Sequence, residues 1–127
     1  MGFSVSRTVI GDVVVLRLTG PANGPEGALR LRDAAVPLFN GGYKKVVLDC
    51  SEFTYTDSAL QGAVVGCFIS LKNVKGELVL ANVQTRVIQV FQIQKIYSLF
   101  RFFDSVPDAL KYFGVPQSQA ASQEAEE

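Results

Sequence analysis

The sequence predicts an α/β fold in which about five strands form a mixed sheet and helices pack on it. Strand-like and helix-like patterns follow one another in the order ββαβαβαβα along the 127 residues. Successive strand–helix–strand units favour parallel pairing with right-handed crossovers. Residues 44–50, KKVVLDC, form a short apolar run with polar ends, as expected of a strand buried on both faces. The chain length suits one domain.

The first third of the chain predicts a hairpin followed by a helix. Residues 3–10 alternate loosely, residues 13–18 are rich in β-branched side chains, and Gly11-Asp12 between them is a turn signal. Pro25 suits the first turn of a helix that runs towards Asn40. Pro37 is expected to bend or shorten this helix. The side chains expected on its buried side are Leu29, Ala35, Leu38 and Phe39.

The remaining elements alternate regularly between helix and strand. The expected helices cover residues 59–71, 85–94 and 106–113, and Ser105 is the expected cap of the last. The expected strands after the buried one cover residues 77–82 and 99–103. Residues 116–127 contain no large apolar side chain and are predicted to form a disordered acidic tail. The folded domain is therefore expected to span residues 1–115.

Charge and hydropathy narrow the classes of function. Twelve basic and twelve acidic residues cancel, so no global field attracts nucleic acid or an anionic bilayer. No stretch approaches the roughly 18 apolar residues that a membrane helix requires. The N-terminus lacks the apolar core of a signal peptide. We therefore expect a cytoplasmic protein that neither binds nucleic acid nor inserts into a membrane.

The composition also disfavours catalysis. The chain contains no histidine, which removes histidine-dependent triads, histidine–zinc sites and the usual general base at neutral pH. It contains neither of the common glycine-rich phosphate-binding motifs. Cys50 and Cys67 stand alone in apolar contexts, which is typical of reduced core residues. We predict no enzyme, no cofactor and no metal site.

One polar segment, FTYTDSALQG (residues 53–62), separates the buried strand from the next helix. Asp57 or Ser58 there can cap the helix, because the first N–H groups of a helix lack intrahelical partners. The same geometry presents the hydroxyl of Ser58 at the edge of the sheet, where functional loops of parallel α/β folds gather. Capping is the more frequent role of such residues, and the residues alone leave both readings open.

Three stretches together resemble the STAS family, the sulphate-transporter and anti-sigma-factor-antagonist domains. They are VVLDCSEFTYTDSALQGAVVG, KGELVLANVQTRVIQVFQ and SLFRFFDSVPDALKYF, and the resemblance covers residues 3–115. In this family a hydrophobic strand ends in an aspartate and a D-S-S-G-L-G-like stretch opens the next helix. Ala59 and Leu60 stand where the family has serine and glycine, and Gln61 replaces an apolar residue.

The resemblance implies a binding module switched by phosphate. Ser58 matches the serine that an anti-sigma factor serine kinase phosphorylates in the antagonists of this family, and a PP2C-like phosphatase is the implied partner that resets it. Asp57 and Thr56 are expected to support the phosphorylation site. The residues expected to contact the partner are Asn23, Ala59, Leu60, Gln61 and Val64.

The helix after Ser58 offers a surplus of apolar surface. From residue 59 to residue 71 only Gln61 and Ser70 are polar, although a helix on a sheet needs one apolar stripe. Either neighbouring helices cover both sides or part of the helix is a docking surface. A second function is therefore open: a scaffold subunit of a stressosome-like particle or of a lipid-transport ATPase. A small-molecule sensor is a remote third, and self-association is left open.

Overall fold

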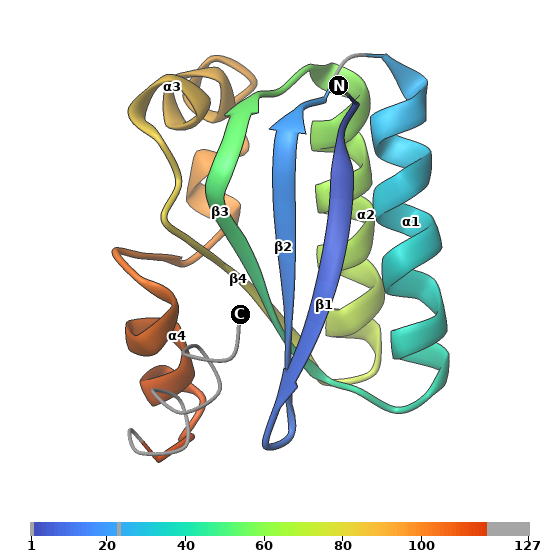
Figure 1. Ribbon diagram of the computed structural model, residues 1–127, viewed down its shortest axis with the longest axis vertical. Coiled ribbons are helices and arrows are strands. Elements are labelled where there is room, and N and C mark those ends of the chain that lie inside the picture. Colours follow the sequence, from blue (N-terminus) through green and yellow to red (C-terminus); the bar gives the residue numbers. More distant parts are fainter. Residues whose placement is uncertain (1, 23, 117–127) are drawn as a thin grey trace.

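The computed structural model describes residues 2–22 and 24–116 and confirms the α/β fold, with a five-stranded mixed sheet in the order β1-β2-β3-β4-β5 (Figure 1). β1 and β2 pair antiparallel as the expected hairpin, and the other neighbours pair parallel. The strands are β1 (Ser4–Ile10), β2 (Val13–Pro21), β3 (Lys45–Tyr55), β4 (Glu77–Ala81) and β5 (Phe102–Phe103).

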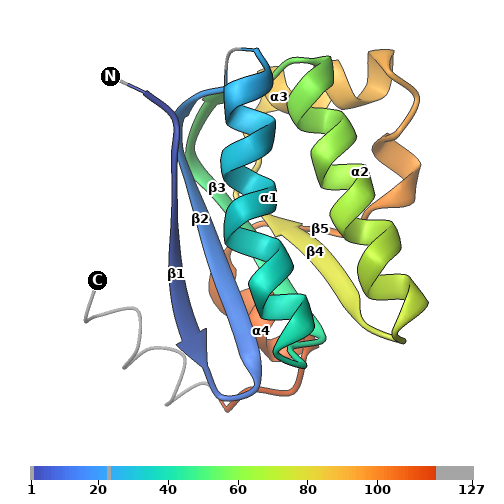
Figure 2. The same cartoon turned by 90° about the vertical axis from the view of Figure 1, so that its right-hand side faces the viewer.

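Helices cover both faces of the sheet. The helices are α1 (Pro25–Asn40), α2 (Ser58–Asn73), α3 (Thr85–Ile93) and α4 (Val106–Tyr112), with a 3₁₀ turn, η1 (Tyr97–Leu99), before β5. α1 and α2 lie side by side on one face (Figure 2), and α4 lies on the other (Figure 1). Among the described residues, no helix is both long and apolar enough to cross a membrane.

The alternation of side chains along the central strands builds two cores. Leu16, Leu48 and Leu80 join the larger cluster, which includes buried residues of α1, α2 and α3. Their neighbours Val47 and Val79 join a smaller cluster with residues of α4. The apolar run of β3 is therefore buried on both faces, as its sequence predicts.

β3 is longer than its sequence predicts. The sequence predicts an end at Cys50, but the strand continues to Tyr55 because β2 also continues to Pro21 and pairs with it. Phe53 is buried and its ring meets that of Phe3 edge to face, with the centroids 6.0 Å apart. The first three residues of the segment FTYTDSALQG therefore belong to the strand, and only Thr56 and Asp57 separate it from α2.

The last strand is shorter than expected. Instead of residues 99–103, only Phe102 and Phe103 pair with β4. The chain before them forms η1 and buries Phe100, whose ring packs against those of Phe68 and Phe91. Burial of this aromatic ring takes the place of further backbone pairing.

Pro37 does not shorten α1, which continues to Asn40. Proline removes the bond that its N–H would donate to the carbonyl of Asp33. Both residues are exposed, so water can replace that bond. Ala35 and Leu38 are buried as predicted and Phe39 packs against the core, but Leu29 is 56% exposed. Of the predicted tail, only Pro116 belongs to the described residues.

Candidate functional site

Asp57 caps α2 and holds the start of this helix in place. Its backbone is extended, and one carboxylate oxygen accepts a hydrogen bond from the backbone N–H of Leu60 at 3.0 Å. An acidic cap satisfies one of the unpaired first-turn donors and complements the positive end of the helix dipole. The capping role that the sequence left open for this aspartate is therefore confirmed.

The second carboxylate oxygen of Asp57 accepts a hydrogen bond from the backbone N–H of Gly24. Gly24 lies 33 residues earlier and immediately precedes α1. Its φ of 76° lies in the left-handed region that glycine adopts readily. Asp57 thus ties the loop before α1 to the start of α2. Asn23, an expected contact residue, lies outside the described residues.

Ser58 is the first residue of α2, and it is exposed. A side chain in this position can be reached from solvent and stands beside first-turn N–H groups, which favour an anion. Thr56, two residues earlier, is only 3% exposed, and its hydroxyl donates to the carbonyl oxygen of Asp57 at 3.4 Å. Thr56 therefore contacts the backbone of the cap and is not open to solvent.

Three of the expected contact residues are not on the surface. Leu60, Gln61 and Val64 are 0%, 3% and 2% exposed, so little of their surface is open to a partner in this conformation. Leu60 and Val64 belong to the larger core, and Ala59 is half-buried against it. The side of α2 that remains open to solvent includes Ser58, Gly62 and Gly66.

A hollow of about 270 Å³ adjoins Ser58, and part of its wall was missed by sequence reasoning. Ser58, Gln61, Gly62 and Val65 of α2 line one side, and Gln94 and Ile96, which follow α3, line the other. Only the helical spacing of Gln61 and Val65, four residues apart, hinted at a common side of α2. Nothing local to residues 94–96 predicts that they lie beside the start of α2.

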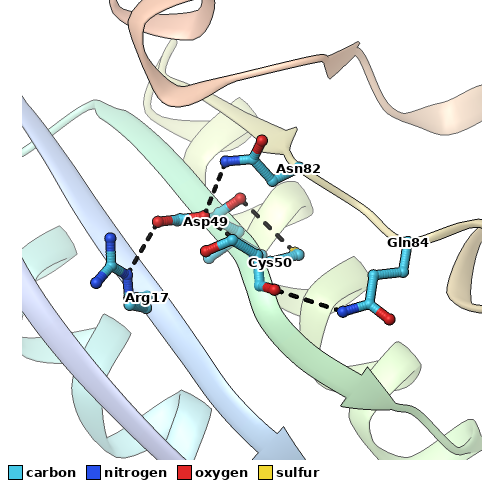
Figure 3. A network of polar contacts seen from close by, with 7 residues as sticks. Arg17, Asp49, Cys50, Asn82 and Gln84 are labelled. Atoms are coloured by element: carbon cyan, nitrogen blue, oxygen red, sulfur yellow. Dashed lines mark hydrogen bonds and ion pairs between the residues drawn. The ribbon is translucent and has the colours of Figure 1, made fainter.

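A second polar cluster around Asp49 in the middle of β3 includes Arg17 of β2 and Asn82, the residue after β4 (Figure 3). Asp49 is 2% exposed and accepts from the Arg17 guanidinium at 3.0 Å, the Asn82 amide at 3.2 Å and the backbone N–H of Ser51 at 3.1 Å. Three donors satisfy this buried carboxylate. The cluster therefore fixes β2, β3 and β4 relative to one another.

The two cysteines are buried and free. Burial raises the pKa of the Cys67 thiol to about 11. It also raises the pKa of Cys50, with a further contribution from the charge of Asp49. Neutral, buried thiols are poor nucleophiles. Among the described residues, no group of three or more histidine, cysteine, aspartate and glutamate side chains is arranged to hold a metal ion.

Comparison with known proteins places these features in a family. A protein of Thermotoga neapolitana that is described as an anti-sigma factor antagonist and a homolog of TM1081 is 26% identical to this chain over 103 residues. The match covers 81% of this chain and 91% of that protein. TM1081 from Thermotoga maritima has a similar fold, with a TM-score of 0.79, 22% identity and coverage of 85% of this chain and 92% of the other.

The anti-sigma factor antagonist SpoIIAA also shares the fold. Its unphosphorylated form gives a TM-score of 0.73 at 21% identity and covers 91% of this chain and 99% of the other. Its phosphorylated form, from Bacillus, gives 0.67 at 20% identity, with coverage of 88% and 99%. The sequence profile of the STAS domain matches residues 4–109, and this chain therefore belongs to the STAS domain family.

Proposed function

We propose that this protein is an anti-sigma factor antagonist whose partner binding is switched by phosphorylation of Ser58. In the unphosphorylated state it binds an anti-sigma factor serine kinase, and the phosphorylated form is released until a PP2C-like phosphatase removes the phosphate. The observation that supports this proposal best is the exposed hydroxyl of Ser58 at the first position of a helix that Asp57 already caps.

The helix itself tolerates a phosphate at this position. The group adds about −1.5 to −2 charges at neutral pH, and a helix N-terminus is a favourable place for an anion. Asp57 already accepts from Leu60 and Gly24. The phosphate therefore faces the remaining first-turn N–H groups, and the domain keeps its fold.

A bound partner does not tolerate the same charge. The surface beside Ser58 is formed by uncharged residues, among them Gly62, Val65 and Ile96. A partner packed on such a surface removes water from it, and an added anion then loses its hydration without gaining a counter-charge. The phosphate also stands next to the carboxylate of Asp57. Phosphorylation is therefore expected to weaken the contact and leave the fold intact.

The proposal is tested by capturing the partner and locating the phosphate. The tagged protein is used to retain binding proteins from a native lysate, and mass spectrometry identifies them. With the retained kinase and ATP, an increment of about 80 Da, one phosphoryl group, is expected on the peptide that contains Ser58. The Ser58→Ala variant should retain the kinase without gaining mass. A phosphate on another residue would contradict the assignment.

The exposed side of α2 favours a second candidate function, that of a scaffold subunit. Gly62, Gly66 and the half-exposed Ile69 share this side. A Cβ placed on either glycine meets no atom within 4 Å, so neither glycine is required by packing within the described chain. Close approach of a second subunit would explain them. Size-exclusion chromatography decides between the two candidates, because a scaffold assembles in the absence of any kinase.

A further inference from the structure

A second hollow, of about 340 Å³, lies where the outer edge of β4 is uncovered, and we call it the β4-edge hollow. β5 pairs only with Leu80 and Ala81, so among the described residues no strand lies beside Glu77 and Leu78 on that edge. The chain between α3 and β5 passes on the side of α2 opposite to α1 (Figure 2) and supplies one wall of the hollow. Its volume lies within the range of small-molecule sites.

The β4-edge hollow combines apolar walls with polar ones. Leu78 and Phe100 are buried, whereas Phe68 is half-buried and Leu99 is 46% exposed. The rings of Phe68 and Phe100 meet edge to face with their centroids 5.1 Å apart, which fixes an aromatic surface. The polar lining residues are Lys72, Glu77, Ser98 and Arg101. The hollow therefore suits a molecule that has both an apolar part and a polar part.

The charges that line the β4-edge hollow do not cancel. Lys72 forms no ion pair with a carboxylate of the described residues, and its Nζ lies 5.6 Å from the centre of the Phe68 ring. Arg101 approaches Glu77 with its Nε at 3.5 Å, which is long for a charge-assisted bond. The Tyr112 hydroxyl lies closer to that carboxylate, at 2.8 and 2.9 Å from its two oxygens. Two cations and one anion leave an excess positive charge, which favours a monoanion.

We propose that the β4-edge hollow binds a small organic carboxylate. Its carboxylate group contacts Lys72 and Arg101, and its apolar body packs on Phe68 and Leu99. Only the Nε of Arg101 is close to Glu77, so the other guanidinium N–H groups can donate to the ligand. Covering the accessible apolar surface of Phe68 and Leu99 adds a hydrophobic contribution that an inorganic anion cannot make. A neutral molecule of the same shape leaves the excess charge without a partner.

The carboxylate site is separate from the proposed phosphorylation site. Ser58 is the first residue of α2 and Lys72 is the last but one, so about 20 Å of helix lies between them. The proposal therefore does not depend on phosphorylation of Ser58. It gives a location to the third function that the sequence left remote, that of a small-molecule sensor.

The test is a titration of the ¹⁵N-labelled full chain with sodium benzoate at constant ionic strength, followed by NMR. Benzoate carries one charge and one apolar ring. We expect saturable shifts, at millimolar concentrations, of the backbone amides of Lys72 and of residues 98–101. Lys72→Met should weaken binding about three- to fivefold, the effect of removing one exposed charge pair. Glu77→Gln removes the opposing charge and should tighten binding by a similar factor.

Matched controls separate the site from general surface charge. Lys95→Met removes an exposed lysine that does not line the hollow, and it should leave the affinity for benzoate unchanged. Benzamide lacks the charge and sulfate lacks the apolar ring, and each should bind about tenfold more weakly than benzoate or less. N-acetyl-L-glutamate N-methylamide presents a carboxylate as a protein side chain does, and it should also bind more weakly than benzoate.

Several results would overturn the proposal. The absence of a saturable shift at residues 98–101 would show that no carboxylate binds there. Equal binding of benzamide would show that charge plays no part, and equal binding of sulfate would show that the hollow only collects anions. Tighter binding of the glutamate derivative would assign the site to an acidic segment of a protein. An equal loss of affinity in Lys95→Met and Lys72→Met would reduce the effect to the net charge of the surface.

Discussion

Asp57 makes two contacts that belong to different parts of the chain. One oxygen caps α2 through Leu60, and the other holds the backbone of Gly24 before α1. The first contact is local and follows from the placement of an aspartate ahead of an apolar run, which is why the sequence alone predicts it. The second joins residues 33 positions apart, and no local pattern indicates it.

Replacing Asp57 tests both contacts. Asp57→Ala should lower the free energy of unfolding by about 1–2 kcal/mol, because it removes a helix cap and a partner of Gly24. Urea denaturation measures the change. Asp57→Asn keeps an oxygen for the cap and should cost less than half as much. Equal losses in both variants would mean that the negative charge, and not the cap, stabilises the helix.

Gln61 shows where the sequence is informative and where it is not. Its departure from the apolar residue of the family is visible in the sequence, but its burial is visible only in the folded chain. Leu60 and Val64 are buried in the larger core, although an isolated helical pattern assigns them equally well to core or contact surface. Which side of a helix is exposed depends on the elements that pack against it.

Gln61→Leu should stabilise the isolated protein. The substitution removes two unpaired polar atoms from a buried site with little change of volume, and we expect a gain of about 1–2 kcal/mol in the free energy of unfolding. Thermal and urea unfolding provide the measurement, with Gln92→Leu as the exposed counterpart. A loss of stability would show that the amide has favourable interactions in solution that offset its burial.

At the scale of elements, α2 has one buried side and one solvent-exposed side, and the exposed side contains two glycines. Gly62 and Gly66 lie in the middle of a sixteen-residue helix, where glycine costs conformational entropy. Both are exposed and unobstructed. The turn that follows α2 differs, because a Cβ on Gly76 would lie 2.6 Å from the carbonyl oxygen of Lys44. Glycine is sterically required at Gly76 and is not required by packing within the chain at the other two positions.

Alanine substitutions separate these cases. Gly62→Ala and Gly66→Ala should each raise the free energy of unfolding by about 0.5–1 kcal/mol, whereas Gly76→Ala should lower it. If the exposed side of α2 contacts another subunit closely, the two stabilised variants should also bind that subunit less tightly. Chemical denaturation and a binding assay on the same samples report both effects. Destabilisation by Gly62→Ala would contradict an unobstructed site.

The lengths of the strands mark the limit of prediction at this scale. The order of strands and helices follows from periodicity, and apart from β3 and β5 the expected elements keep their predicted positions to within about three residues. β3 extends beyond Cys50 because β2 pairs with the added residues. β5 is shortened because Phe100 enters the aromatic cluster. Both differences arise from contacts between distant segments, which local patterns do not contain.

At the scale of the whole molecule, a hydrophobic core covers each face of the sheet, and Cys50 and Cys67 both lie in the larger core. Their raised pKa values keep them as neutral thiols near neutral pH. We expect neither to react with a thiol reagent at pH 8 in the folded protein on the time scale of minutes, and both to react in urea. Labelling followed by mass spectrometry gives the number of thiols that have reacted. Rapid labelling of the folded chain would show that the core opens readily.

The arrangement of the whole domain leaves Ser58 exposed at the start of α2, although its neighbours Thr56 and Leu60 are buried. The loop before α1 lies beside this position, because the backbone N–H of Gly24 donates to Asp57. The chain after α3 lines the hollow next to Ser58. A charge added there alters the surface that a partner meets without entering either core. The proposed switch therefore depends on the charge of Ser58 and not on a change of fold.

Isothermal titration calorimetry of the protein with the proposed partner, an anti-sigma serine kinase, tests this claim most directly. Ser58→Glu should weaken binding by about tenfold or more, while Ser58→Ala should bind within about threefold of the unaltered protein. Ser70→Glu introduces the same charge at an exposed position farther along α2, and it should have a much smaller effect. Undiminished affinity of Ser58→Glu, in a variant that remains folded, would contradict the account.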